Sequence, residues 1–522
     1  MSDALLPLLI ALPLLAGIFP LLLGLRFERA GWPVAMTASL TVAVLAGWLA
    51  WAVSPWSGGP QRFVHDLAGY PAPYGIELVG DGLSAILALL ISVVAVAVLI
   101  YGRTTGPQTN AFYSGYLLLT GGLLGMALTG DLFNLFVFLE IVGLVSYALI
   151  ASSDDGRAAY GALKYLFLGT TGASLYLIGV GYALVATGTL NMGDMATELA
   201  AVGYTDPLVQ AAFGFILIGF MLKIAIFPLH TWQPDAYTYA PDTVSAFISA
   251  LVSTTAAYAL IRIAYDVFTV DFFAANPLIT DAVLLVASVS IVVGSLLALL
   301  QTELKRVFAY SSVAQFGMIL AAIGLQSETA LFGAVIHLVG HGLMKATLFM
   351  GAGVLASAYG AQTVADYAGL AKRAPITSGM MAVAGLALVG IPPSIGTLGK
   401  WFIALGAVEE GSWGVAAVIF ISTLLTLTYI GRLLETLYFN QPATTDDETG
   451  VVGDAGDATD DGSIVADGGD TERATAGIDD VAPVATERIV VVVVLALSTV
   501  ALFGAAGLFA EFLDPVFGRF FQ

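Results

Sequence analysis

The feature that most constrains this chain is a series of about fourteen apolar runs, each near the ~20 residues that an α-helix needs to cross a bilayer. Lipid offers no hydrogen bonds to exposed backbone groups, so such runs fold as helices packed into a bundle. The sequence therefore predicts an all-α polytopic membrane protein. The runs lie at 4–25, 33–53, 82–101, 112–130, 131–152, 161–187, 207–228, 243–265, 277–300, 307–325, 328–357, 376–407, 413–438 and 489–511.

Composition agrees with this class and excludes others. The 522 residues are 58% hydrophobic and 11% charged, where a soluble domain carries about 25% charge. The net charge of −20 argues against nucleic acid as a partner, because phosphate binding needs basic patches. An acidic, lysine-poor surface is typical of proteins in a high-salt cytoplasm. The chain has no cysteine, which excludes disulfides and thiolate-bound iron–sulfur clusters within it.

Loop charges predict the orientation. Because basic residues favour the cytoplasmic side, the loops that hold them are expected there, and both termini are expected outside the cell membrane. Lys305 and Arg306 are interpreted as cytoplasmic anchors, whereas the loop after the seventh run is an acidic exception with Asp235 and Asp242. The first run, 4–25, has no basic leader and is expected to span rather than to be cleaved. The basic loop residues are Arg26, Arg29, Arg103, Arg157, Lys305, Arg306, Lys372, Arg373 and Arg432.

Three segments between the runs have their own character. Loop 54–80 contains three prolines and predicts an external turn or hairpin, and 191–202 predicts a short amphipathic surface helix. Residues 441–486 are rich in Asp, Gly, Ala and Thr and predict an acidic, disordered cytoplasmic loop. A calcium site there is the alternative, although the Asp spacing fits no EF-hand.

Residues 216–242 read ILIGFMLKIAIFPLHTWQPDAYTYAPD. Lys223 lies inside the apolar part, and Pro228 follows five residues later, where a helix must kink or break. His230 and Asp235 then occupy a polar segment. A break at membrane depth is tolerated only where protein or a water-filled cavity covers the freed carbonyls. A lysine beside such a break indicates an ion path, because a charge facing lipid costs at least ~3 kcal/mol.

A second stretch, 389–401, repeats this plan with Pro392, Pro393 and Lys400. The alternative is a pair of kinked helices whose lysines reach the membrane interface. The chain has only six lysines, yet it places Lys223, Lys345 and Lys400 inside apolar segments. A lysine gains and loses its proton far more readily than an arginine does, which suits a proton carrier.

Glu140 is the only acidic residue between positions 132 and 150. Its obvious partner is Lys223, and a carboxylate–ammonium pair that opens and closes would act as a switch for proton release. A permanent, structural salt bridge between the two residues is the alternative.

His337, His341 and Lys345 follow one another at intervals of four residues and share one helix face. We interpret them as a hydrated row of titratable groups in the middle of the membrane. Two histidines at this spacing can also bind zinc, but no HExxH glutamate accompanies them, so no metal is predicted. Histidines that only pack between helices are the other alternative.

Seven motifs resemble the antiporter-like membrane subunits shared by Mrp-type multisubunit Na⁺/H⁺ antiporters and by complex I and related hydrogenases. In its length and in the wording of these motifs, the chain looks most like the D-type subunits of Mrp antiporters. The motifs are DGLSA at 81–85, GDLFNLFVFLEI at 130–141, ALKYLFLG at 162–169, KIAIFPLHTWQPDAYTYAP at 223–241, LKRVFAYSSVAQFG at 304–317, HLVGHGLMKATLF at 337–349 and GIPPSIGTLGKW at 390–401.

The resemblance implies fourteen helices that include two inverted five-helix repeats, runs 4–8 and 9–13, with runs 7 and 12 discontinuous. It divides the chain into three N-terminal spans (1–111), a first repeat (112–265), a second repeat (277–438), the acidic loop (441–486) and a last span (487–522).

The resemblance also implies roles. Glu140 and Lys223 match the family's glutamate–lysine pair, and Lys400 matches its terminal lysine. The row on run 11 matches the family's central hydrophilic axis. One departure is Thr254, which stands about where the family usually has a lysine on run 8. Further positions are expected to support the path: Lys164, His230, Asp235, Thr254, Pro228, Pro392 and Pro393.

The predicted function is ion translocation within a multisubunit cation/proton antiporter, with H⁺ and Na⁺ as transported ions and no cofactor bound by this chain. A proton-pumping membrane subunit of a quinone- or hydrogen-linked redox complex is the alternative, because electron carriers would sit in other subunits. A third hypothesis is a packing subunit that does not conduct, which only Thr254 favours.

Overall fold

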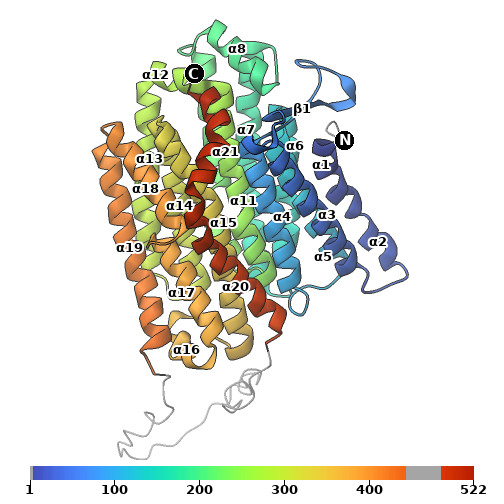
Figure 1. Cartoon of the computed structure of the whole chain (residues 1–522), viewed down its shortest axis with the longest axis vertical. Coiled ribbons are helices and arrows are strands. Elements are labelled where there is room, and N and C mark those ends of the chain that lie inside the picture. Colours follow the sequence, from blue (N-terminus) through green and yellow to red (C-terminus); the bar gives the residue numbers. More distant parts are fainter. Residues whose placement is uncertain (1–3, 442–483, 522) are drawn as a thin grey trace, which may run out of the picture.

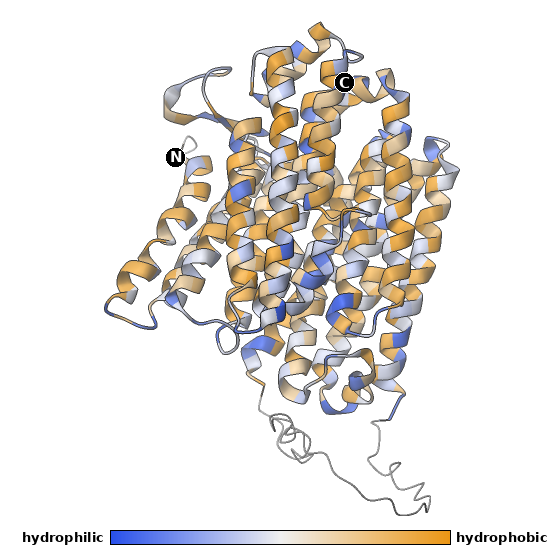
Figure 2. Cartoon of the chain, turned by 180° about the vertical axis from the view of Figure 1, so that it is seen from behind, coloured by the Kyte–Doolittle hydropathy of each residue, from blue (hydrophilic) through white to orange (hydrophobic). Residues whose placement is uncertain are grey.

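The computed structural model describes residues 4–441 and 484–521, and in this part the chain is a bundle of long, roughly parallel helices (Figure 1). Most of the predicted acidic loop, 441–486, lies outside the described residues. Hydrophobic residues cover much of the helical surface between the two ends of the bundle, as lipid contact requires (Figure 2). The chain is therefore an all-α, multi-span membrane protein, as the apolar runs predict.

Twelve helical stretches in the described part are long and apolar enough to cross a bilayer. Two further runs, 7 and 12, are broken into shorter helices, and with the twelve continuous stretches they make the fourteen spans expected of the described part. The long stretches are α1 (Leu5–Ala16) with α2 (Phe19–Gly24), α3 (Gly31–Ala52), α4 (Gly82–Tyr101), α5 (Asn110–Leu128), α6 (Leu132–Ile150), α7 (Gly156–Thr187), α11 (Asp242–Arg262) with the π-helical η3 (Ile263–Phe268) and α12 (Thr269–Ala275), α13 (Pro277–Leu299), α14 (Leu304–Leu325), α15 (Glu328–Tyr359), α19 (Trp413–Tyr438), and α20 (Thr486–Ala501) with η6 (Leu502–Ala505) and α21 (Ala506–Phe520).

The two interrupted spans have the same plan. In run 7, α9 (Pro207–Lys223) is separated from α10 (Trp232–Tyr239), and in run 12, α17 (Pro375–Val389) is separated from α18 (Ile395–Glu409). The predicted prolines lie in the two gaps. The structure thus confirms that runs 7 and 12 are discontinuous, one in each predicted repeat.

Short elements cover the ends of the bundle. Strands β1 (Arg62–Asp66) and β2 (Glu77–Asp81) pair as an antiparallel hairpin, and α8 (Met192–Val202) is the predicted surface helix. Both lie at the end of the molecule that also carries the two termini (Figure 1). The remaining elements are η1 (Pro55–Ser57), η2 (Leu67–Gly69), η4 (Val364–Tyr367) and α16 (Leu370–Arg373).

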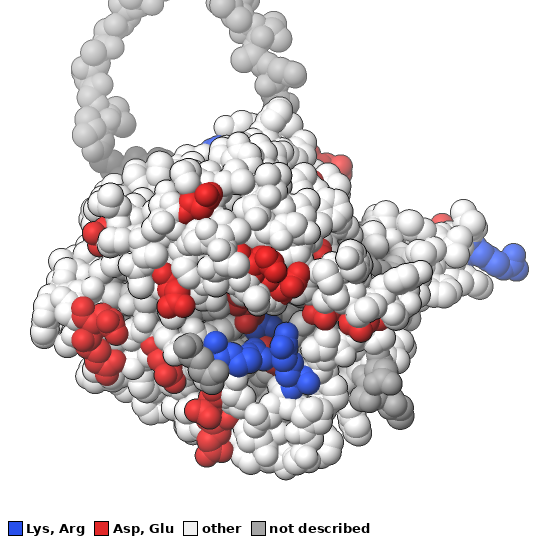
Figure 3. Space-filling model, turned by 90° about the horizontal axis from the view of Figure 1, so that it is seen from above, with Lys and Arg blue, Asp and Glu red and all other residues white. Residues whose placement is uncertain are grey.

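An ion cluster ties the last helix to this end of the bundle. Asp81 is fully buried and accepts from Arg262 at 2.9 Å and from Arg519 of α21 at 2.7 Å. Burial alone would raise the pKa of Asp81, but the two guanidinium groups hold it well below its usual range. Figure 3 shows basic side chains near the centre of this face, among many acidic ones.

Burial identifies the centre of the bundle. The apolar windows of α11 and α15 are 100% buried, whereas those of α3 and α19 are only 33% buried. α11 and α15 pack directly against each other. The polar side chains on these two helices are therefore shielded from lipid by the helices around them.

Candidate functional site: a buried polar axis

Protein groups cover the interruption between α9 and α10. The Trp232 indole donates to the carbonyl of Leu222 at 2.8 Å, and the Ser253 hydroxyl of α11 donates to the carbonyl of Lys223 at 3.2 Å. The Leu222 carbonyl also accepts from the Ala225 amide at 3.3 Å, so the indole adds a second donor there, and Ser253 gives the Lys223 carbonyl a donor at membrane depth. The carbonyls at this break therefore do not need the Lys223 ammonium as a hydrogen-bond donor.

The Lys223 side chain is left available. It is 5% exposed, and no hydrogen-bond partner for its Nζ is present among the described residues. A cavity of about 10 Å³ adjoins it, lined also by Gly143, Tyr165 and Val252. This volume is about that of one water molecule, which would give the amine a partner with which to exchange a proton.

Glu140 lies one turn before Gly143 on α6, and Gly143 directly adjoins the Lys223 amine. The buried Oε1 of Glu140 has no hydrogen-bond partner in the described part of the chain. The ion pairs found within residues 4–441 and 484–521 do not include Glu140 with Lys223, whose separation is thus beyond 4.0 Å. The two predicted partners, Glu140 and Lys223, therefore lie near each other but do not form an ion pair.

Lys400 is arranged differently. Its Nζ donates to the carbonyls of Leu388 at 2.8 Å and Val389 at 3.0 Å, the last two residues of α17. Gly390 follows in the left-handed region, with φ of 96°, and ends the helix. Lys400 is therefore a cap on a helix C-terminus, where the carbonyl dipoles favour a positive charge.

The row on α15 lies at the centre of the bundle. His337, His341 and Lys345 are all fully buried. Lys345 Nζ donates to the carbonyl of Phe308 at 2.6 Å and to the hydroxyl of Ser311, both on α14. These contacts hold the ammonium against a polar strip of α14.

The two histidines differ in their contacts. His341 lies 3.3 Å from Ser312 and 3.5 Å from Thr254, one partner on each side of its ring. The ring nitrogens of His337 have no hydrogen-bond partner among the residues described. Its backbone packs against Gly399, where an added Cβ would lie 2.6 Å from the His337 Cβ. Gly399 thereby brings the histidine row next to the helix that carries Lys400.

α11 connects the first lysine site to the histidine row. Ser253 bonds the carbonyl of Lys223, and the next residue, Thr254, contacts His341. The structure thus links the break at Lys223, α11, the histidine row and α14 by named polar contacts. From the sequence, Thr254 stands out only as a departure from the family. The sequence does not single out Ser253, because it is one of several Ser and Thr residues on α11.

A second set of charges surrounds α10. Asp235 accepts from Lys164 of α7 at 2.7 Å and from Arg306 of α14 at 2.8 Å, and Lys305 pairs with Asp242 at 2.5 Å. The charge pattern of the sequence predicted membrane anchors at the two basic residues of α14. In the structure they form ion pairs with the two acidic residues that made this loop an exception in that pattern, and their cytoplasmic position stays a prediction.

His230 is buried in the interruption, between Phe227 and Tyr310, at ring distances of 5.4 and 5.8 Å. Its Nδ1 has no partner within the described residues, and it makes no hydrogen bond there to the histidine row. The structure therefore leaves His230 beside the axis rather than in it.

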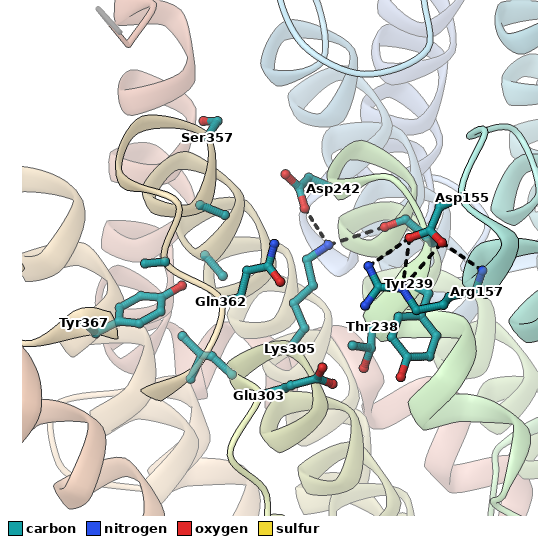
Figure 4. A pocket seen from close by; sticks show the side chains of 15 residues that line it. Asp155, Arg157, Thr238, Tyr239, Asp242, Glu303, Lys305, Ser357, Gln362 and Tyr367 are labelled. Carbon is teal, nitrogen blue, oxygen red and sulfur yellow. Dashed lines mark hydrogen bonds and ion pairs between the residues drawn. The ribbon is translucent and has the colours of Figure 1, made fainter. Parts of the chain in front are cut away.

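A polar pocket of about 320 Å³ opens between the two halves of the bundle (Figure 4). Among the same helices, Phe349 packs edge-on against Tyr237 and Phe308 at ring distances of 6.0 and 5.8 Å. Phe349 lies one turn from Lys345 on α15, so this aromatic cluster stands close to the buried row. The lining includes Thr238, Tyr239, Asp242, Lys305, Ala352, Ser357 and Gln362.

The described residues contain no group of three or more His, Cys, Asp or Glu side chains placed to hold a metal ion. The alternative of a zinc site at His337 and His341 thus finds no third ligand there. The row on α15 and the Lys223 site hold ionisable side chains and hydroxyls, which can take up or relay protons, while the backbone carbonyls accept hydrogen bonds.

A bundle with two interrupted helices and a lipid-shielded row of ionisable groups defines the class of polytopic ion-translocating membrane proteins. Residues 129–426 match the family model described as NADH:quinone oxidoreductase/Mrp antiporter, TM. This match spans more than half of the chain, and the chain belongs to this family.

Curated relatives carry names from both branches of the family. The N-type subunit of the NADH-quinone oxidoreductase of Desulforudis audaxviator is 41% identical over 82% of this chain and 86% of its own length. The D-type subunit of the Na(+)/H(+) antiporter of Bacillus subtilis is 32% identical over 70% of this chain and 74% of its own length. Both branches that the motifs resemble are therefore represented.

Solved structures agree in fold along the whole chain. A chain of the archaeal membrane-bound sulfane sulfur reductase matches with a TM-score of 0.84 and 28% identity, covering 99% of this chain and 98% of that one. A chain of the Mrp complex from Dietzia sp. DQ12-45-1b matches with a TM-score of 0.83 and 24% identity, covering 100% and 98%. At 24% identity the second match supports the fold alone.

Proposed function

We propose that this chain is the proton-translocating subunit of a multisubunit Na⁺/H⁺ antiporter in the cell membrane. The observation that carries the proposal is the buried polar axis: two lysines at two helix interruptions, with polar contacts running from the first through α11 to the histidine row on α15. The proton path uses Glu140, Lys223, His337, His341, Lys345 and Lys400.

In this path, a proton held on Lys223 is released when Glu140 and Lys223 change their separation. The water-sized cavity beside Lys223 and the Thr254 hydroxyl beside His341 supply the relays. Lys345 and then Lys400 receive the charge in the second half. The polar pocket between the halves is the mouth of the path on one face.

Other subunits are required by this proposal. The chain would assemble with further Mrp-type antiporter subunits, which contribute the coupling to Na⁺. The two termini share one end of the bundle (Figure 1), and the basic loops argue that this end is extracytoplasmic. The transmembrane gradient supplies the driving force, about 2.3 kcal/mol per charge per 100 mV.

The experiment is Lys223→Ala in the assembled complex, with antiport followed in everted vesicles. We expect antiport to be lost while assembly is unchanged, because the Nζ makes no hydrogen bond among the described residues. Lys372→Ala is the matched control, since Lys372 is an exposed lysine of α16. An assembled Lys223→Ala complex with full antiport defeats the proposal.

The alternative is a proton-pumping membrane subunit of a quinone- or hydrogen-linked redox complex. The relative that is 41% identical and named as a quinone oxidoreductase subunit favours it. Co-purification separates the two: small membrane subunits without redox centres support the antiporter, and iron–sulfur or quinone-binding subunits support the redox complex. A purely packing role predicts that Lys223→Ala leaves transport unchanged.

A further inference from the structure

Asp235 stands between the two halves of the bundle. Its two carboxylate oxygens take one cation each: Oδ2 from Lys164 of α7, and Oδ1 from Arg306 of α14. The side chain of Asp235 is 8% exposed, so these pairs are shielded from solvent far more than surface pairs are. One carboxylate therefore fixes α10 against a helix from each predicted repeat.

Toward the first half, α10 transmits this position to the Lys223 site. Trp232 lies one turn before Asp235, and its indole holds the carbonyl of Leu222 at the break. The ring of Trp232 stacks on Tyr165 at 3.8 Å, and Tyr165 is the neighbour of Lys164 on α7. A shift of Asp235 relative to α7 would thus move the group that caps the break beside Lys223.

Toward the second half, α14 transmits the same position to the histidine row. Arg306 comes two residues before Phe308, whose carbonyl binds Lys345. The following turn of α14 carries Ser312, which contacts His341. Asp235 therefore pairs with the same end of α14 that bonds Lys345 and His341.

Two cations share this single carboxylate, which makes its position sensitive to charge. Arg306 has one more neutralising neighbour, Glu303 at 3.9 Å, and bonds the Tyr239 hydroxyl at 3.1 Å. If Asp235 moves toward Lys164, the start of α14 gains positive charge near Lys345, and movement toward Arg306 reverses this. The arrangement can favour either side without a new partner.

We propose that Asp235 is a positioning residue that couples the sites of Lys223 and Lys345. Its ion pair with Arg306 fixes α10 relative to α14. A change of charge at Lys223 therefore shifts the surroundings of Lys345, and a change of charge at Lys345 shifts those of Lys223. This inference rests on the proposed function, because it assigns no chemistry of its own to Asp235. It adds a connection between two parts of the proton path.

The test uses the complete complex in everted vesicles. Asp235→Asn and Arg306→Gln are each expected to lower proton flux by about tenfold. The double variant is expected to lose no more than Asp235→Asn alone, because Asp235→Asn already removes the pair with Arg306 as well as the pair with Lys164. Arg306→Lys, which keeps the charge, is expected to recover most of the flux.

Two matched controls separate coupling from general damage. Asp206 caps α9 by accepting from the Leu208 amide at 2.8 Å, and asparagine caps helices equally well, so Asp206→Asn is expected to leave flux unchanged. Arg373→Gln removes an exposed guanidinium and is likewise expected to be silent.

Several results would overturn the inference. They are full flux in an assembled Arg306→Gln complex, additive losses in the double variant, or no recovery with Arg306→Lys. If Asp235→Asn fails to assemble, Arg306→Gln decides the question, because it leaves the Lys164 pair in place. Loss of antiport in Lys223→Ala together with full flux in Arg306→Gln rejects the coupling alone, whereas full antiport in Lys223→Ala rejects the function beneath it.

Discussion

The two interrupted helices place a lysine at each break but use it in opposite ways. At the first break, Trp232 and Ser253 donate to the Leu222 and Lys223 carbonyls, and the Lys223 amine has no hydrogen bond among the described residues. At the second break, Lys400 itself bonds the last two carbonyls of α17. The same backbone problem is thus solved by neighbouring side chains in one half and by the lysine in the other.

The comparison distinguishes a lysine whose amine is free to exchange protons from a lysine whose amine holds the end of a helix. A proton carrier must change its charge without collapsing its surroundings, and Lys223 meets this condition because nothing depends on its hydrogen bonds. Lys400 is coupled to its helix end, so discharging it would weaken a cap. The first site is therefore suited to rapid exchange, and the second to a step that is linked to movement of α17 and α18.

The largest expected effect is on transport through the first site. Lys223→Arg keeps a positive charge but removes the ability to release a proton, so we expect flux to fall by about 100-fold or more. Proton uptake into everted vesicles measures this. Near-normal flux with arginine would show that a positive charge alone is needed at this position. The proposed difference between Lys223 and Lys400 would then not hold.

A stability measurement contrasts the two lysines directly. Lys400→Ala leaves two buried carbonyls without a donor and is expected to cost about 1–3 kcal/mol for each in the free energy of unfolding. Lys223→Ala removes no hydrogen bond in the described structure and is expected to cost less than Lys400→Ala. Thermal unfolding of the detergent-solubilised protein compares them, and equal shifts would contradict the different roles.

Converting the first break into the second should reduce transport. Trp232→Phe removes the side-chain donor to the Leu222 carbonyl, and the Lys223 amine is then expected to take its place there, as Lys400 bonds the carbonyls at its own break. We expect about tenfold lower flux from this misplacement. Trp401→Phe, an exposed tryptophan next to Lys400, is the control that should have no effect.

The smallest effect is expected at the connection between the sites. Thr254→Val removes the hydroxyl near His341 with little change in shape, and flux is expected to fall by about fivefold, the size of one hydrogen bond. Thr255→Val on the same buried turn is the comparison, because the Thr255 hydroxyl has no partner among the described residues. Equal effects of the two would remove Thr254 from the path.

The sequence predicted the spans and both interruptions because hydropathy and proline act locally. It also indicated Lys223, Lys400 and the row on α15, since a charge in an apolar run is conspicuous. It could not predict that Glu140 and Lys223 stand apart, or that Arg306 reaches Asp235, because those contacts depend on how distant helices pack. Ser253 and Trp232 were equally hidden, as their importance comes from carbonyls that only the folded break exposes.

Adjacent positions on α11 serve different neighbours. Successive residues of an α-helix are rotated by about 100°, so Ser253 faces the first break while Thr254 faces the histidine row. A substitution of Thr254 can therefore change proton flux through the histidine row without disturbing the hydrogen bond of Ser253 to the carbonyl of Lys223. Relatives could thus evolve faster or slower conduction through one codon, on an otherwise identical scaffold.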